Sequence, residues 1–216
     1  MLPTRFAAVL LLGLPAIAAE MPLPELRIEP TGGGSIFYIK NNSPVPLAAY
    51  LIELVGYPGS SYSFWQDETV AEPIPPKTEK RIQVANMTVG AVPDYVKMQA
   101  AVYTGGRSAG IPEKVAQLRE RRRAMLDTVR QLIGRIEKAQ AEKSPKSDLI
   151  AGLKQSADAM QPAGRSNRNS QAAINQAASR DVILVTNVRI GMQSAAEALT
   201  MLRAWERTLS ANTPSQ

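Results

Sequence analysis

The sequence predicts a segregated α+β fold, in which an all-β sandwich comes first and a long antiparallel helical hairpin follows. Two observations support this prediction. Up to Ile111, apolar residues alternate with polar ones or form short runs between clusters of Gly, Pro and Asn, as is typical of strands. From Pro112 onward, apolar residues recur at steps of three and four, which is typical of helices with one buried face.

The first nineteen residues have the features of a secretory signal peptide. Arg5 supplies positive charge, residues 6–14 are apolar, and Ala16, Ala18 and Ala19 supply the small residues that signal peptidase needs. The apolar run is too short for a stable anchor across a bilayer about 30 Å thick, although an uncleaved anchor remains the alternative. We therefore expect a secreted or periplasmic protein without a transmembrane segment in its mature chain.

Residues 20–111 contain six predicted strands separated by turn residues. The strand at 47–55 is apolar on both faces and should be central, whereas those at 80–86 and 96–104 alternate between apolar and polar residues. Short strands with no helical stretch between them favour a sandwich. The six strands are 25–29, 35–40, 47–55, 61–66, 80–86 and 96–104.

Within this region, Tyr38-Ile39-Lys40-Asn41-Asn42-Ser43 is followed by Ala49-Tyr50-Leu51-Ile52-Glu53-Leu54. This pattern resembles the second and third strands of immunoglobulin-like and fibronectin type III-like domains, over about ninety residues. The buried Cys pair and the Trp of antibody domains have no counterpart. The resemblance implies a binding or spacing module of bacterial secreted proteins and assigns no functional residue.

The helical region, 112–211, begins with a proline and an acidic residue, both suited to a helix N-terminus. Apolar residues keep their heptad phase across Pro145, so we predict one leg kinked there rather than two helices. A chain that breaks at Pro145 into a compact three-helix bundle is the alternative. The predicted segments are a first leg at 112–161, a turn at 162–166, a return leg at 167–211 and a disordered tail at 212–216.

Each leg has a predicted seam that faces the other leg. Antiparallel pairing places Lys143 opposite Asp181, and Arg122 one layer from Glu206, so that buried acids meet bases. Apolar residues outside the seam need further cover, which predicts homo-oligomerisation through the helices. The first seam includes Val115, Leu118, Arg122, Met125, Val129, Leu132 and Ile136; the second includes Ile174, Ala178, Asp181, Val185, Val188, Met192, Leu199, Leu202, Glu206 and Leu209. The uncovered residues are Leu126, Ile133, Ile183, Leu184, Ile190 and Trp205.

The composition argues against catalysis. The chain has no His and no Cys, which removes the commonest general bases, nucleophiles and metal ligands, so we expect no enzyme activity, cofactor or metal. Residues 20–111 carry 7 basic and 9 acidic residues, whereas residues 112–216 carry 17 and 10. The helical half is therefore basic and should attract any acidic partner.

Three clusters are candidate interaction sites. The first contains the aromatic residues Tyr57, Tyr62, Phe64 and Trp65, which either stack on a sugar or protein partner or, the reading we favour, fill the sandwich core. The second contains the basic residues Arg119, Arg121, Arg122 and Arg123, for which we favour a solvated helix face over a site for an anionic partner. The third contains the acidic residues Asp67, Glu68 and Glu72, which we interpret as a solvated loop rather than a calcium or glycosidase site.

These observations favour a non-enzymatic interaction or scaffold protein, in which the sandwich binds and the helical arm spaces or oligomerises. Its partner would be a protein or an envelope component, and no specific nucleic acid is expected. A second hypothesis is a periplasmic holdase, since long helical arms on a β body resemble the trimeric periplasmic chaperones of outer-membrane proteins. A third is a basic surface protein that attaches to anionic envelope polymers.

Overall fold

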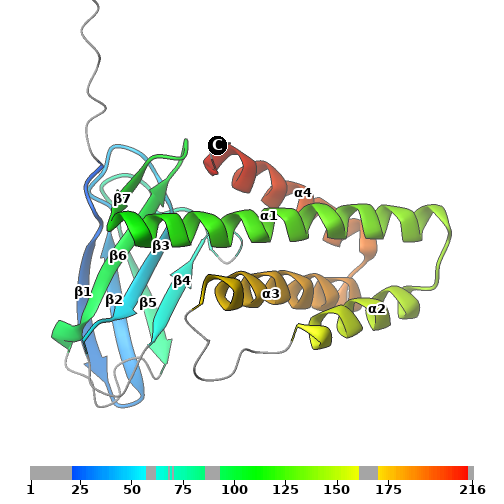
Figure 1. Ribbon diagram of the computed structural model, residues 1–216, viewed down its shortest axis with the longest axis horizontal. Helices are drawn as coiled ribbons and strands as arrows, with labels where there is room; N and C mark the ends of the chain where they lie inside the picture. The colour runs from blue at the N-terminus through cyan, green and yellow to red at the C-terminus, as the bar shows by residue number, and fades with distance from the viewer. Residues whose placement is uncertain are drawn as a thin grey trace, which may run out of the picture.

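The computed structural model describes residues 21–56, 62–67, 69, 71–85, 93–160 and 170–213. It shows a β module followed by four helices (Figure 1). All six predicted strands are confirmed, and a seventh strand of three residues follows them. The strands are β1 (Glu25–Thr31), β2 (Gly34–Lys40), β3 (Leu47–Leu54), β4 (Ser63–Gln66), β5 (Glu79–Ala85), β6 (Val96–Tyr103) and β7 (Ser108–Gly110), with a short 3₁₀ helix, η1 (Pro93–Tyr95), before β6.

The strands form two antiparallel sheets, with the orders β1-β2-β5 and β4-β3-β6-β7. Phe37 and Ile39 of the first sheet pack in one apolar core with Tyr50 and Ile52 of the second. The prediction that β3 is buried on both faces is confirmed, because Ala49 and Leu51 belong to a separate cluster shared with the first helix. The four-stranded sheet thus lies between the other sheet and a helix.

The helices differ from the predicted hairpin. They are α1 (Pro112–Ala141), α2 (Lys146–Ala159), α3 (Gln171–Met192) and α4 (Ala195–Asn212). The first leg breaks rather than kinks, because Lys143 adopts a left-handed φ of 54° and Pro145 precedes α2 as its N-cap. The break at Pro145 that defined the alternative is therefore present.

The return leg also contains a break, between α3 and α4. The alternative of a three-helix bundle is therefore wrong in the number of helices, because the structure has four. Gln193 leaves the helical region with φ −124° and ψ −106°, and the Ser194 side chain accepts a hydrogen bond from the Glu197 backbone N–H. A Ser with an acidic residue three positions later is a capping pattern that starts a new helix. The prediction of one continuous helix from 167 to 211 is therefore wrong at Gln193 and Ser194.

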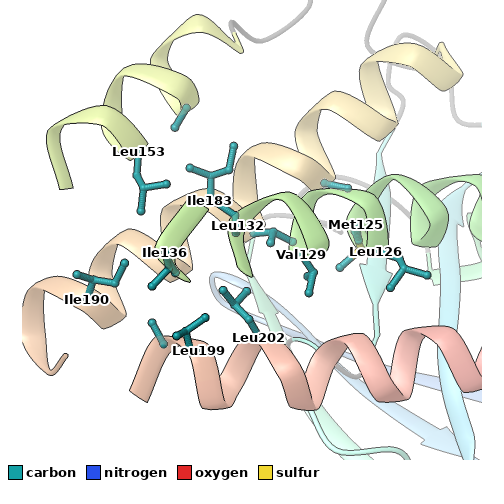
Figure 2. Close-up of a cluster of buried hydrophobic side chains, with 14 of the residues drawn as sticks. Met125, Leu126, Val129, Leu132, Ile136, Leu153, Ile183, Ile190, Leu199 and Leu202 are labelled. Carbon is teal, nitrogen blue, oxygen red and sulfur yellow. The ribbon is translucent and has the colours of Figure 1, made fainter. Parts of the chain in front are cut away.

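The helices pack around α1, which contacts α3 and α4, while α2 packs against α3. Figure 2 shows Ile183 and Ile190 of α3 and Leu199 and Leu202 of α4 converging on side chains of α1. The predicted seam of α1 is confirmed, because all seven of its residues from Val115 to Ile136 are buried. The predicted seam of α3 is wrong after Ala178, since Ile183 and Ile190 take the buried positions and Val185, Val188 and Met192 are exposed.

Candidate interaction surfaces

The first turns of α1 attach the helical module to the sandwich. Figure 1 shows α1 starting over the four-stranded sheet and continuing into the helical module. Val115 and Leu118 pack against β3 and β6. Two polar contacts lie beside this apolar patch: Lys114 Nζ is 2.6 Å from Glu53 Oε2, and Arg119 Nη2 donates to the Gly106 carbonyl at 3.0 Å. The apolar and polar contacts together define the orientation of α1 on the sheet.

A buried ion pair completes this junction. Arg121 Nη1 lies 2.6 Å from Asp67 Oδ2, and the two side chains are 9% and 0% exposed. The Thr69 backbone N–H donates to Asp67 Oδ1 at 2.9 Å, and the guanidinium carbon lies 5.5 Å from the centre of the Trp65 ring. Burial acts to raise the pKa of Asp67, but Arg121 and the Thr69 hydrogen bonds outweigh it and hold that pKa below its ordinary value.

The predicted basic cluster is therefore divided among several internal contacts. Arg121 and Arg122 are buried, Arg119 is half-buried, and Arg123 pairs with Glu120 of the same helix at 2.9 Å. The interpretation of the cluster as a solvated face is correct only for Arg123. The Arg122 position in the predicted seam was the one sequence signal that an arginine would be buried here.

The predicted acidic loop needs a correction at Asp67, which is buried and paired rather than solvated. Glu72 is exposed, and Glu68 lies outside the described residues. No signal in the sequence links Asp67 to Arg121, because 54 positions separate them. Only the packing of α1 across the four-stranded sheet brings them together.

The aromatic residues do not form one surface. Phe64 packs into the sandwich core, with its ring centre 5.9 Å from that of Phe37, whereas Trp65 points to the opposite face beside α1. Tyr62 is 37% exposed, and Tyr57 lies outside the described residues. The alternation of side chains along β4 explains this division.

The structure does not form the polar pairs that were predicted between the two legs of the hairpin. Asp181 lies within electrostatic range of Arg121 and Arg180, near the start of α1. Lys143 lies in the α1–α2 turn, about 30 Å farther along that helix at 1.5 Å per residue. The Lys143–Asp181 pair is therefore excluded. Glu206 forms an ion pair with Arg130, at 3.1 Å, rather than lying one layer from Arg122 in a two-leg seam.

In the described α-helices, the exposed large apolar side chains gather in the C-terminal half of α3. We call this surface the distal α3 face and define it by Leu184, Val185, Val188 and Met192. Val185, Val188 and Met192 are 46%, 59% and 82% exposed. They line a hollow of about 590 Å³ together with Leu184, Arg189 and Gln193. This end of α3 lies next to the start of α2, where Lys146 Nζ donates to the Gly191 carbonyl at 3.1 Å.

A second hollow, of about 580 Å³, lies where the two sheets meet at β1 and β6. Leu26 and Ile28 of β1 and Val96 and Met98 of β6 line it, between charged residues of both signs. The short strand β7 pairs with β6 only from Ala100 to Val102. Val96 and Met98 therefore have no β7 partner, and the sandwich is open along this seam in the described part of the chain.

Within the described ranges, acidic side chains form no group of three or more that could hold a metal ion. None of the helices in those ranges combines the length and apolar character needed to cross a membrane. Comparisons of the chain with models of protein families, with curated proteins and with solved structures give no match.

Proposed function

We propose that this protein is a non-enzymatic interaction or scaffold protein, secreted or periplasmic, that docks a protein partner through the distal α3 face. The observation that carries the proposal is the strong exposure of Val188 and Met192 on a helix that already has a complete apolar face inside the bundle. A helix that is apolar on both sides is usually buried on both sides. We therefore expect another protein surface to cover the outer side of α3.

The energetic gain from covering this face is substantial. Complete burial of an aliphatic or Met side chain stabilises by about 1.5–3 kcal/mol. Val185, Val188 and Met192 together would contribute a few kcal/mol, reduced by the side-chain ordering that binding requires. This is the scale of a small hydrophobic centre within an interface, rather than of a large obligate one.

The junction between the modules supports a scaffold role. α1 belongs to the sandwich at Val115 and Leu118 and to the bundle from Met125 onward, and no flexible linker separates these parts. The buried Arg121–Asp67 pair adds a specific contact between them. A partner on the distal α3 face would thus be held at a fixed orientation to the sandwich, for which we propose an immunoglobulin-like binding or spacing role without a cofactor.

Site-specific photo-crosslinking tests the docking proposal. A photo-reactive amino acid at position 188 should yield a discrete adduct in cells that express the protein. The same group at Thr200, an exposed position of α4, is the matched control and should yield none. Equal labelling at both positions, or none at either, would contradict docking at the distal α3 face.

A holdase role is the second candidate, because an apolar hollow beside Arg189 suits unfolded segments that are both apolar and acidic. A holdase should suppress aggregation of many unrelated unfolded clients, and Met192→Lys should abolish this effect. Attachment to anionic polymers has less support, because Arg119, Arg121 and Arg122 make contacts within the protein. Salt-sensitive retention on an anionic polymer would favour that third hypothesis.

A further inference from the structure

The outer side of α3 has the spacing of a helix–helix seam. Asp181, Val185, Val188 and Met192 follow one another at steps of four, three and four, which places them on one stripe. All four are exposed. Val182, Ile183, Thr186 and Ile190 are buried on another face of α3, whereas Ala178, one step before Asp181, is buried at the N-terminal end of the stripe. The outer stripe therefore has the pattern of a coiled-coil seam without a partner helix among the described residues.

We infer that a second copy of this chain covers the stripe, with the two α3 helices antiparallel about a two-fold axis. The inference rests on the proposed function, since it names the partner that docks on the distal α3 face. A two-fold contact needs a surface that is complementary to itself. On the distal α3 face Met192 is 82% exposed and lines the same apolar hollow as Leu184, Val185 and Val188, so an identical face can pack against it.

Antiparallel pairing matches the shape of the stripe. Val188 of each copy then faces Val185 of the other. These two valines, which are less exposed than Met192, form the centre of the contact. Met192 of each copy then lies over the turn that contains Asp181 and Leu184 of the other. The most exposed apolar side chain thus covers the Leu184 end of its partner's hollow.

The charges on α3 distinguish antiparallel from parallel pairing. Asp181 lies at one end of the stripe, and Arg189 flanks its other half. In the antiparallel register, Asp181 of one copy is only about 4–5 Å along the axis from Arg189 of the other, at 1.5 Å per residue. A parallel pair would align like charges with one another. Arg189 donates through Nη1 to Gln193 at 2.7 Å, which leaves its other N–H groups for the partner copy.

Sedimentation velocity on the purified protein tests the inference. The wild type should change from monomer to dimer between about 1 μM and 1 mM, the range of weak specific association. Val188→Lys should raise the dissociation constant at least about ten-fold. Thr200→Lys adds the same charge at an exposed site of α4 and should leave that constant unchanged. A wild type that stays monomeric throughout, or equal effects of the two variants, would overturn the inference.

Disulfide trapping tests the orientation, since the chain contains no cysteine of its own. Val188→Cys places thiols near the two-fold axis and should form crosslinked dimers readily. Met192→Cys places them about 16 Å apart along the axis in the antiparallel register and should not. Rapid crosslinking of Met192→Cys would show a parallel arrangement and refute the register.

These outcomes separate the inference from the proposed function. A monomeric protein that still yields a discrete photo-adduct with another protein at position 188 would refute self-association and keep the docking function. A monomeric protein without any adduct would refute both. Loss of the dimer in Val188→Lys, together with an adduct of twice the chain mass at position 188, would support both.

Discussion

Replacing Asp67 by Asn should destabilise the protein far more than any exposed charge substitution. Asn keeps the size of the side chain and can still accept the hydrogen bond from Thr69. It removes the negative charge and can place an N–H₂ group where Oδ2 accepts from Arg121. Arg121, which is 9% exposed, would then keep its charge without its buried counter-ion.

The expected loss in the free energy of unfolding follows from the burial of the ion pair. Breaking a buried ion pair by removing one partner typically costs about 3–5 kcal/mol. The lower value, about 3 kcal/mol, should apply here, because Asp181 and the Trp65 ring still attract the guanidinium. For a chain of this length, that corresponds to a fall in Tm of roughly 6–12 °C.

The measurement is urea unfolding followed by circular dichroism and by fluorescence. Glu120→Gln is the matched control, because it breaks the Arg123–Glu120 pair, whose side chains are 31% and 47% exposed. It should cost at most about 1 kcal/mol. Arg121→Met in the Asp67→Asn background should restore most of the lost stability, since neither charge then remains buried.

Two results would refute this reasoning. One is a cost of Asp67→Asn no larger than that of Glu120→Gln. The other is a failure of Arg121→Met to rescue the variant.

The same pair predicts an effect of pH. Because the pKa of Asp67 is lowered in the folded state, its contribution to stability is present above the unfolded pKa of about 3.9. That contribution is lost as the pH falls through the folded value. The stability difference between wild type and Asp67→Asn should therefore be constant near neutrality and shrink below about pH 4. A difference that does not change with acidification would contradict the lowered pKa.

Three further predictions concern other parts of the fold. Asn41→Ala should cost about 3 kcal/mol in urea unfolding, because the Asn41 amide donates to the Val45 and Ile74 carbonyls and its oxygen accepts from the Ser43 N–H, all within the protein. Lys143→Gly should stabilise by about 0.5–1 kcal/mol, because glycine adopts a positive φ without strain, whereas Lys138→Gly within α1 should destabilise by about 1 kcal/mol. Burial raises the pKa of Tyr103 to about 12, so in an absorbance titration its phenolate should form only well above pH 10; the stability it contributes is lost as pH rises above the unfolded value, and full ionisation near pH 10 would disprove its burial.

The β module could be predicted well because its signal is local. Alternation of apolar and polar residues identifies a strand wherever one face is buried, and β5 shows it clearly, whereas β6 is buried on both faces from Met98 onward. The two-sided apolar pattern of β3 identified a central strand. What covers its second face could not be predicted, because a sequence pattern records burial and not the identity of the covering element.

The helical module shows where periodicity fails. The α1 seam was correct because α1 has one dominant apolar stripe. α3 has two such stripes, one through Ile183 and Ile190 and one through Val188 and Met192, so the heptad spacing alone selects the wrong one. The in-phase continuation across Pro145 was equally uninformative, since two short amphipathic helices can share a phase without being one helix.

The buried Arg121–Asp67 pair could not be predicted from the sequence for a different reason. Asp67 and Arg121 are ordinary exposed residue types in sequence, and only the tertiary contact between β4 and α1 turns them into a buried pair. The distal α3 face could not be predicted either, because the heptad spacing places Val185, Val188 and Met192 in the buried seam. Ile183, Leu184 and Ile190, which the same spacing leaves without cover, are buried in the bundle or packed against it.

The end of α4 has a consequence for how this protein is completed during synthesis. The Asn212 side-chain oxygen accepts a hydrogen bond from the Gly105 N–H at 2.9 Å, so the last helical turn closes onto the β6–β7 turn, 107 positions earlier. A chain made from its N-terminus has all seven strands and α1 long before this contact is available. Until then, the α1 side chains that face Leu199, Leu202 and Leu209 are uncovered. A chain truncated before α4 would expose that apolar surface, so quality-control proteases could distinguish it from the finished protein.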